Sequence, residues 1–104
     1  MNHGRVAMLE QTIDAVKNRG KYYGPPGEHF GRTVGAINAL FKSKLKEPLT
    51  EADWAQFMII DKIAREQERA KPDNAVDMAG YAACLFEVSE KRYTDARLPR
   101  ESKR

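Results

Sequence analysis

Apolar residues recur three and four positions apart along most of this chain, which is the spacing of amphipathic α-helices. In the N-terminal segment Val6, Leu9, Ile13 and Val16 share one face, and charged residues occupy the other. Four segments have this period, and they predict helices over residues 6–18, 29–42, 51–69 and 74–93. No segment alternates with a period of two, so strands are not expected. The pattern predicts an all-α, single-domain four-helix arrangement.

The connections between these segments refine the prediction. Arg19-Gly20 is typical of a helix end, and the following KYYGPPGEH stretch, with two prolines and two glycines, is expected to be irregular. Thr50 followed by Asp53 is a capping-box pattern for the start of the third helix. The break at Lys71-Pro72 is short, so the third and fourth helices should form a central antiparallel hairpin. Apolar residues surround most of the third helix, which predicts that it is the most buried element.

Composition limits the class of protein. The 104 residues are 41% hydrophobic and 32% charged, a balance typical of one soluble domain. No apolar run approaches the ~18 residues of a membrane span, and Cys84, the only cysteine, allows no intrachain disulfide. We expect a cytoplasmic protein with no membrane contact.

Basic residues gather at the C-terminal end. Six basic and two acidic residues lie within 91–104, so this stretch carries +4 and the remaining chain −1 of the net +3. We therefore expect a helical domain over residues 1–94 and a basic, flexible tail over 95–104. A tail of this charge can make weak nucleic-acid contacts.

The third helix carries the first candidate site. Asp61 and Arg65 are aligned with the apolar residues of that helix, and Lys62 lies at the edge of the same face. One interpretation is a set of i, i+4 ion pairs, worth a few tenths of a kcal/mol each. The alternative is a small basic pocket in which Lys62 and Arg65 hold an anion such as phosphate.

The start of the fourth helix carries the second candidate. Asn74 and Asp77 suit a helix cap and its first-turn acid. Asp77 also shares a face with Tyr81, and the hairpin brings it near the basic residues of the third helix, so that an Arg65–Asp77 or Lys62–Asp77 contact is expected. Because a charge on a packing face needs a partner, we expect such a contact to be buried.

The motifs in this order resemble a small family of phage- and prophage-encoded helical proteins of uncharacterised function. The resemblance covers about residues 10–88, and His29 stands where asparagine is expected. It rests on YGPP at 23–26, HF at 29–30, MIIDKIAR at 58–65 and DNAVDMAGYA at 73–82. The resemblance implies a phage origin, and with it the cytoplasm of the host cell. It also implies an all-α fold and no known reaction. Its polar positions form one candidate ligand-binding site, made of Tyr23, His29, Lys62, Arg65, Asp73, Asn74, Asp77 and Tyr81.

Three functions compete for this pattern. The first is a non-catalytic binding protein for a nucleotide-like, phosphate-bearing ligand or for a host protein, with no cofactor. The second resembles the all-α MazG-like nucleoside triphosphate pyrophosphatases, which need several carboxylates to hold Mg²⁺; the Lys-x-x-Arg core of the third helix does not fit their acidic motif. The third is a structural polar latch, with function on another surface. The Ala- and Gly-rich side of the fourth helix also predicts self-association, as a homodimer or a higher assembly.

Overall fold

Four α-helices and one short 3-10 turn make up the fold, and they confirm the all-α prediction. The computed structural model describes residues 4–23 and 25–89, and no strand occurs among them. The elements are α1 (Gly4–Tyr23), α2 (Pro26–Leu40), η1 (Lys42–Lys44), α3 (Glu51–Glu68) and α4 (Pro72–Val88). Residues 90–93 of the predicted fourth helix and the predicted tail over 95–104 lie outside the described residues.

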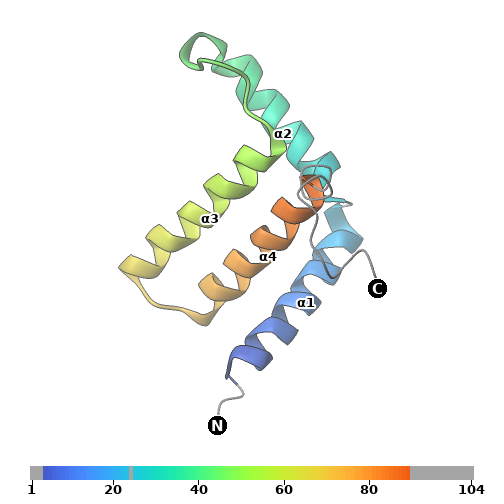
Figure 1. The fold of residues 1–104 in the computed structure, drawn as a ribbon, viewed down its shortest axis with the longest axis vertical. Helices are drawn as coiled ribbons and strands as arrows, with labels where there is room; N and C mark the ends of the chain where they lie inside the picture. Colours follow the sequence, from blue (N-terminus) through green and yellow to red (C-terminus); the bar gives the residue numbers. More distant parts are fainter. Residues whose placement is uncertain (1–3, 24, 90–104) are drawn as a thin grey trace, which may run out of the picture.

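Helix α4 is the middle element of the molecule. It packs against α3 as the second arm of the predicted hairpin and against α1 on its other side (Figure 1). Within the described ranges, the backbones of α1 and α3 do not approach each other. The prediction that α3 is the most buried helix is therefore wrong. Only Ala55 is buried on α3, whereas Phe57, Ile60 and Ile63 are about half exposed.

Helix α2 crosses one end of this arrangement and supplies much of the core. Phe30 and Val34, both buried, lie one turn apart on its inner face. The far end of α2 projects beyond the other helices (Figure 1), and Leu40 there is largely exposed. Asn38 of α2 holds the segment that leads into α3. Its side-chain amide donates to the Leu49 carbonyl at 3.0 Å and accepts from the Leu49 N–H at 2.8 Å.

The connection from α1 to α2 is shorter than the sequence predicted. Helix α1 continues past Gly20 to Tyr23, and α2 begins at Pro26. A single glycine weakens a helix without ending it, whereas proline disfavours helical backbone at the residue before it. Pro26 itself suits the first position of a helix, where its missing N–H costs no hydrogen bond. The predicted irregular stretch over 21–29 is thus largely helical.

The start of α3 has the local structure that the sequence predicted. The Thr50 hydroxyl accepts from the Asp53 N–H at 3.1 Å, and the Asp53 carboxylate accepts from the Thr50 N–H at 2.9 Å. These two bonds form the complete capping box and satisfy donors that an uncapped helix start would leave unpaired. The capping box fixes where α3 begins after the long turn from α2.

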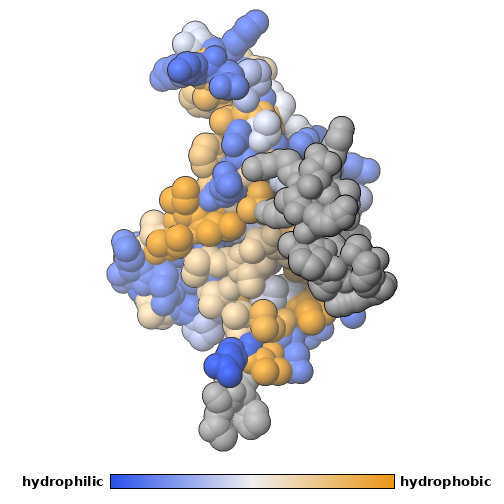
Figure 2. Space-filling view, in the orientation of Figure 1, coloured by the Kyte–Doolittle hydropathy of each residue, from blue (hydrophilic) through white to orange (hydrophobic). Residues whose placement is uncertain are grey.

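Few large apolar side chains are buried among the described residues. The buried hydrophobic residues are Phe30, Val34, Ala55 and Val76. The predicted apolar stripe of α1 is formed, but its members are about half exposed; they are Val6, Leu9, Ile13 and Val16. Figure 2 shows apolar residues spread over α3, across α4 and onto the lower part of α1, all on one face of the molecule. The packed core is accordingly small, and much apolar surface remains uncovered.

Candidate functional site

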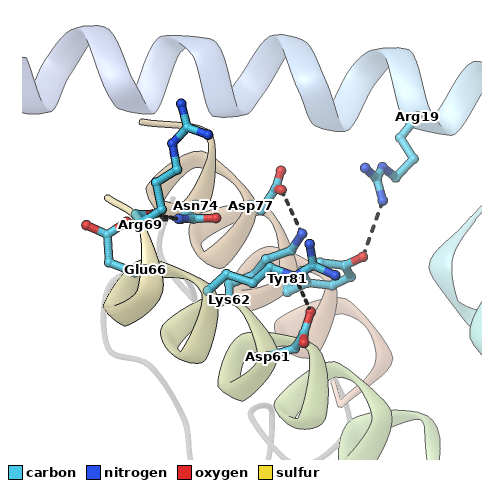
Figure 3. A network of polar contacts seen from close by, with 9 residues as sticks. Arg19, Asp61, Lys62, Glu66, Arg69, Asn74, Asp77 and Tyr81 are labelled. Carbon is cyan, nitrogen blue, oxygen red and sulfur yellow. Dashed lines mark hydrogen bonds and ion pairs between the residues drawn. The ribbon is translucent and has the colours of Figure 1, made fainter. Parts of the chain in front are cut away.

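An ion pair between α3 and α4 forms one end of the candidate site. The Lys62 Nζ atom lies 3.1 Å from Asp77 Oδ2, and the two side chains are 15% and 30% exposed (Figure 3). Of the two contacts that the sequence allowed for Asp77, the structure contains this one. The pair is largely withdrawn from water, so each charge depends on the other for compensation.

Arg65 does not make the predicted contact with Asp77 of α4. Its Nε donates to Asp61 Oδ2 at 2.9 Å, one turn earlier on α3, and the two side chains are 62% and 43% exposed. Asp61 is one helical turn away on the same face, so Arg65 need not reach across to α4. An exposed i, i+4 pair of this kind contributes at most a few tenths of a kcal/mol. Arg65 therefore has no buried charge partner on α4.

Asn74 holds the turn between α3 and α4. Its buried side-chain amide donates to Glu66 Oε1 at 2.9 Å and to the Arg69 carbonyl at 3.3 Å. The same Glu66 oxygen accepts from the Lys71 N–H at 3.2 Å. The bond from Asn74 and then the bond from Lys71 lower the pKa of Glu66, because both stabilise the ionised carboxylate. Asn74 thus ties the chain across the turn instead of capping α4, whose cap position is Lys71.

Tyr81 connects α4 with both N-terminal helices. Its ring stacks on Phe30 of α2 at a centroid distance of 6.3 Å. From α1, the Arg19 guanidinium lies 5.9 Å from the centre of the Tyr81 ring, and Arg19 Nη1 donates to the Tyr81 hydroxyl at 3.5 Å (Figure 3). Sequence reasoning missed Arg19, because its position at an expected helix end gave no sign of a partner sixty residues away.

A half-open cavity of about 90 Å³ lies among α1, α4 and the start of α2. Three of the predicted site residues line it: His29, Asp77 and Tyr81. Arg19 and Glu87 are the other charged residues of the lining. The remaining lining residues are mainly small or apolar; they are Ala15, Val16, Pro26, Phe30, Val76, Gly80, Ala83 and Cys84. The cavity combines an apolar interior with one arginine, two carboxylates and a tyrosine hydroxyl in its lining.

Cys84 contributes to the interior of this cavity as a neutral thiol. Burial raises the pKa of this thiol above the ordinary value; the charge of Arg19 opposes this with a smaller effect, and the charge of Glu87 adds a still smaller increase. A thiol with a raised pKa is a poor nucleophile at neutral pH. The structure therefore gives Cys84 a packing role in the wall of the cavity.

The eight predicted site residues do not form one cluster. Asp77 connects two groups, since it pairs with Lys62 and also lines the cavity with His29 and Tyr81. Arg65 and Asn74 border a second, shallow depression at the α3–α4 turn, together with Glu68, Arg69 and Lys71. Asp73 is exposed in the first turn of α4. The backbone of Tyr23 ends α1, and its side chain lies outside the described part of the structure.

The described residues include no group of three or more His, Cys, Asp or Glu side chains placed to hold a metal ion. In the same part of the chain, no helix is long and apolar enough to cross a bilayer.

The fold and these contacts define a small helical protein whose middle helix makes polar contacts with both α1 and α3. A family model described as a domain of unknown function, DUF6378, matches residues 7–89, and the chain belongs to this family. It is also similar to the Gene 55 protein of Mycobacterium phage D29, with 38% identity over 87 residues. That alignment covers 82% of this chain and 55% of the phage protein, so the chain spans about half the length of this relative. No solved structure matches.

These comparisons identify a phage-associated family of unknown function. The resemblance that the sequence motifs indicated is confirmed at this level. Neither comparison names a ligand or a reaction, so the function has to be argued from the geometry of the site.

Proposed function

We propose that this protein is a non-catalytic binding protein for a small phosphate-bearing, nucleotide-like ligand. The observation that carries the proposal is the cavity among α1, α2 and α4, which has an apolar interior and Arg19 in its lining. In the proposed complex an aromatic ring enters the cavity beside Tyr81, and the phosphate lies outside, against the Arg19 guanidinium. Arginine suits this role because its planar donors match phosphate oxygens in pairs.

The size of the cavity supports partial entry of the ligand. About 90 Å³ corresponds to roughly three water molecules, well below the roughly 300–1,000 Å³ of pockets that enclose a drug-sized molecule. A half-open cavity of this size accommodates the edge of a ring and leaves a charged group in solvent. Asp77 would repel an anion if it were alone, but Lys62 compensates its charge at 3.1 Å.

Replacing Arg19 with alanine tests the proposal. We expect Arg19→Ala to weaken nucleotide binding about 10-fold or more, because a charge-assisted hydrogen bond is worth roughly 1.5–3 kcal/mol. Isothermal titration calorimetry with ribo- and deoxynucleoside mono- and triphosphates, with and without Mg²⁺, measures the change. The melting temperature of the variant should stay close to that of the parent, since Arg19 is exposed.

Arg65→Ala is the matched control, because Arg65 is also an exposed arginine with a side-chain contact but does not line the cavity. We expect this variant to bind as the parent does. A loss of binding in Arg65→Ala alone would move the phosphate site to the outer side of α3. Release of pyrophosphate in the titrated samples would favour the pyrophosphatase alternative. No binding of any nucleotide at millimolar concentration would contradict the proposal.

A second candidate function is favoured by the Lys62–Asp77 pair. Each of the two charges compensates the other, and the ion pair joins α3 to α4. In this alternative the polar residues are a structural latch, and the protein acts through another surface, toward a host protein. The two candidates differ in one measurement. A latch without a ligand site predicts that added nucleotide leaves the melting temperature of the parent protein unchanged, whereas a nucleotide that binds the folded protein raises it.

A further inference from the structure

The side of α4 that faces away from the cavity carries an uncharged surface. Helical spacing places a row of small and apolar residues there, consisting of Ala75, Ala79, Ala82 and Phe86. Helix α3 continues this surface with a second uncharged row, consisting of Gln56, Ile59, Ile60, Ile63 and Gln67. On the other flank, α1 adds Val6, Leu9 and Ile13. We call these three rows the alanine face, and Figure 2 looks onto it.

Helices α1, α4 and α3 lie next to one another in that order (Figure 1), and within residues 4–23 and 25–89 no second layer of helices lies over this side. Two layers packed around one core are the usual solution for a helical domain. Here α2 covers part of the opposite side, where Phe30 meets Tyr81. Five large side chains of the alanine face are about half exposed; they are Val6, Leu9, Ile13, Ile60 and Ile63.

The exposed apolar area matches one side of a stable homodimer. Each of the five half-exposed side chains has an exposed apolar area on the order of 100 Å², so together they present roughly 500 Å². A standard interface buries about 800 Å² on each partner, and in homodimers about 65% of it is apolar, or about 500 Å². The surface therefore has the area that the apolar part of such an interface needs.

The chemistry of the alanine face fits a second copy of the same chain. A two-fold interface brings each surface against itself, so any charge near the axis would meet its own copy. The rows on α3 and α4 contain no charged residue. Alanine side chains in the middle let two helix backbones approach closely, while the longer side chains of α1 and α3 pack around them.

From these observations we propose that two copies pair through the alanine face, with α4 against α4 at the two-fold axis. The pairing supplies the second layer of helices that the described residues of one chain do not provide on this side. The proposal does not depend on nucleotide binding, because the cavity and the alanine face lie on different sides of α4.

Sedimentation equilibrium of the full chain, from low to high micromolar concentration, tests the pairing. We expect the parent protein to have the mass of two chains. Ala82→Glu places a charge at the centre of the alanine face, and we expect it to weaken dimerisation by about 100-fold or more, because the charge would be buried without a partner. Ala82 is exposed in the single chain, so the Ala82→Glu variant should keep the helical content of the parent, as measured by circular dichroism.

Two further variants make the result specific. Ile60→Glu, on the α3 flank, should also give single chains. If Ala82→Glu does not fold, this variant tests whether the alanine face is the dimer interface. Leu40→Glu is the matched control, since Leu40 is an exposed apolar residue at the projecting end of α2, outside the alanine face. It should leave the dimer intact. A single-chain mass of the parent at every concentration would overturn the proposal, as would dissociation by Leu40→Glu but not by Ala82→Glu.

Discussion

Replacing Phe30 with alanine should lower the free energy of unfolding by about 3–5 kcal/mol, the usual cost of deleting a buried phenylalanine. Phe30 is 4% exposed and is the largest of the buried hydrophobic residues among those described. Its ring also stacks on Tyr81, so the substitution removes a contact between α2 and α4. A domain of this size has roughly 5–15 kcal/mol of stability in total. The measurement is urea unfolding followed by circular dichroism at 222 nm.

The matched control for Phe30→Ala is Leu40→Ala, on the same helix. Leu40 is 79% exposed, so its truncation should change the free energy of unfolding by less than about 0.5 kcal/mol. Equal effects of the two substitutions would mean that α2 does not pack against α4 in the way described. A small effect of Phe30→Ala alone would show that the core does not depend on this ring.

Breaking the Lys62–Asp77 ion pair from one side should be the second largest effect. Lys62→Met leaves Asp77 without its partner, and we expect a loss of about 2–3 kcal/mol. The loss stays below the roughly 3–5 kcal/mol of a fully buried pair because both side chains retain some exposure to solvent. The double variant Lys62→Met/Asp77→Leu should be more stable than either single variant, since it leaves no unpaired charge. Thermal unfolding of the four proteins gives the coupling free energy of the pair.

The Asp61–Arg65 pair on the same helix is the control for this cycle. Its side chains are largely exposed, so the corresponding coupling should be only a few tenths of a kcal/mol. Similar coupling in the two cycles would contradict the distinction between a latch across two helices and a solvated pair on one. Additive effects of Lys62→Met and Asp77→Leu would show that the two charges do not depend on each other.

The sequence predicted the helices well because periodicity reports local structure. The capping box at Thr50 and the α3–α4 hairpin depend on residues near each other in the chain, and both are present. The burial of α3 was predicted wrongly, since a row of isoleucines shows that a helix has apolar sides but not which neighbours will cover them. Ile60 and Ile63 are exposed because α4 is the main neighbour of α3 and lies on another side.

The contacts of the candidate site were predicted only where the two residues lie close together in the sequence. The hairpin brings Lys62 to Asp77, and the helical period brings Arg65 to Asp61. The contact of Arg19 with Tyr81 depends instead on how α1 docks against α4, which no local pattern encodes. Whether the cavity and its polar residues bind a ligand stays a prediction.

The position of Arg19 in the chain also bears on the order in which the structure assembles. The contact between Arg19 and Tyr81 closes a loop of 62 residues, whereas that between Glu66 and Asn74 closes one of 8. Each doubling of loop length adds about 0.6 kcal/mol of closure entropy, so docking α1 costs about 2 kcal/mol more than closing the hairpin turn. Helix α1 should thus join late and open early, a sequence that amide hydrogen exchange would reveal. The cavity, which α1 completes, would then exist only while this late-docking helix is in place.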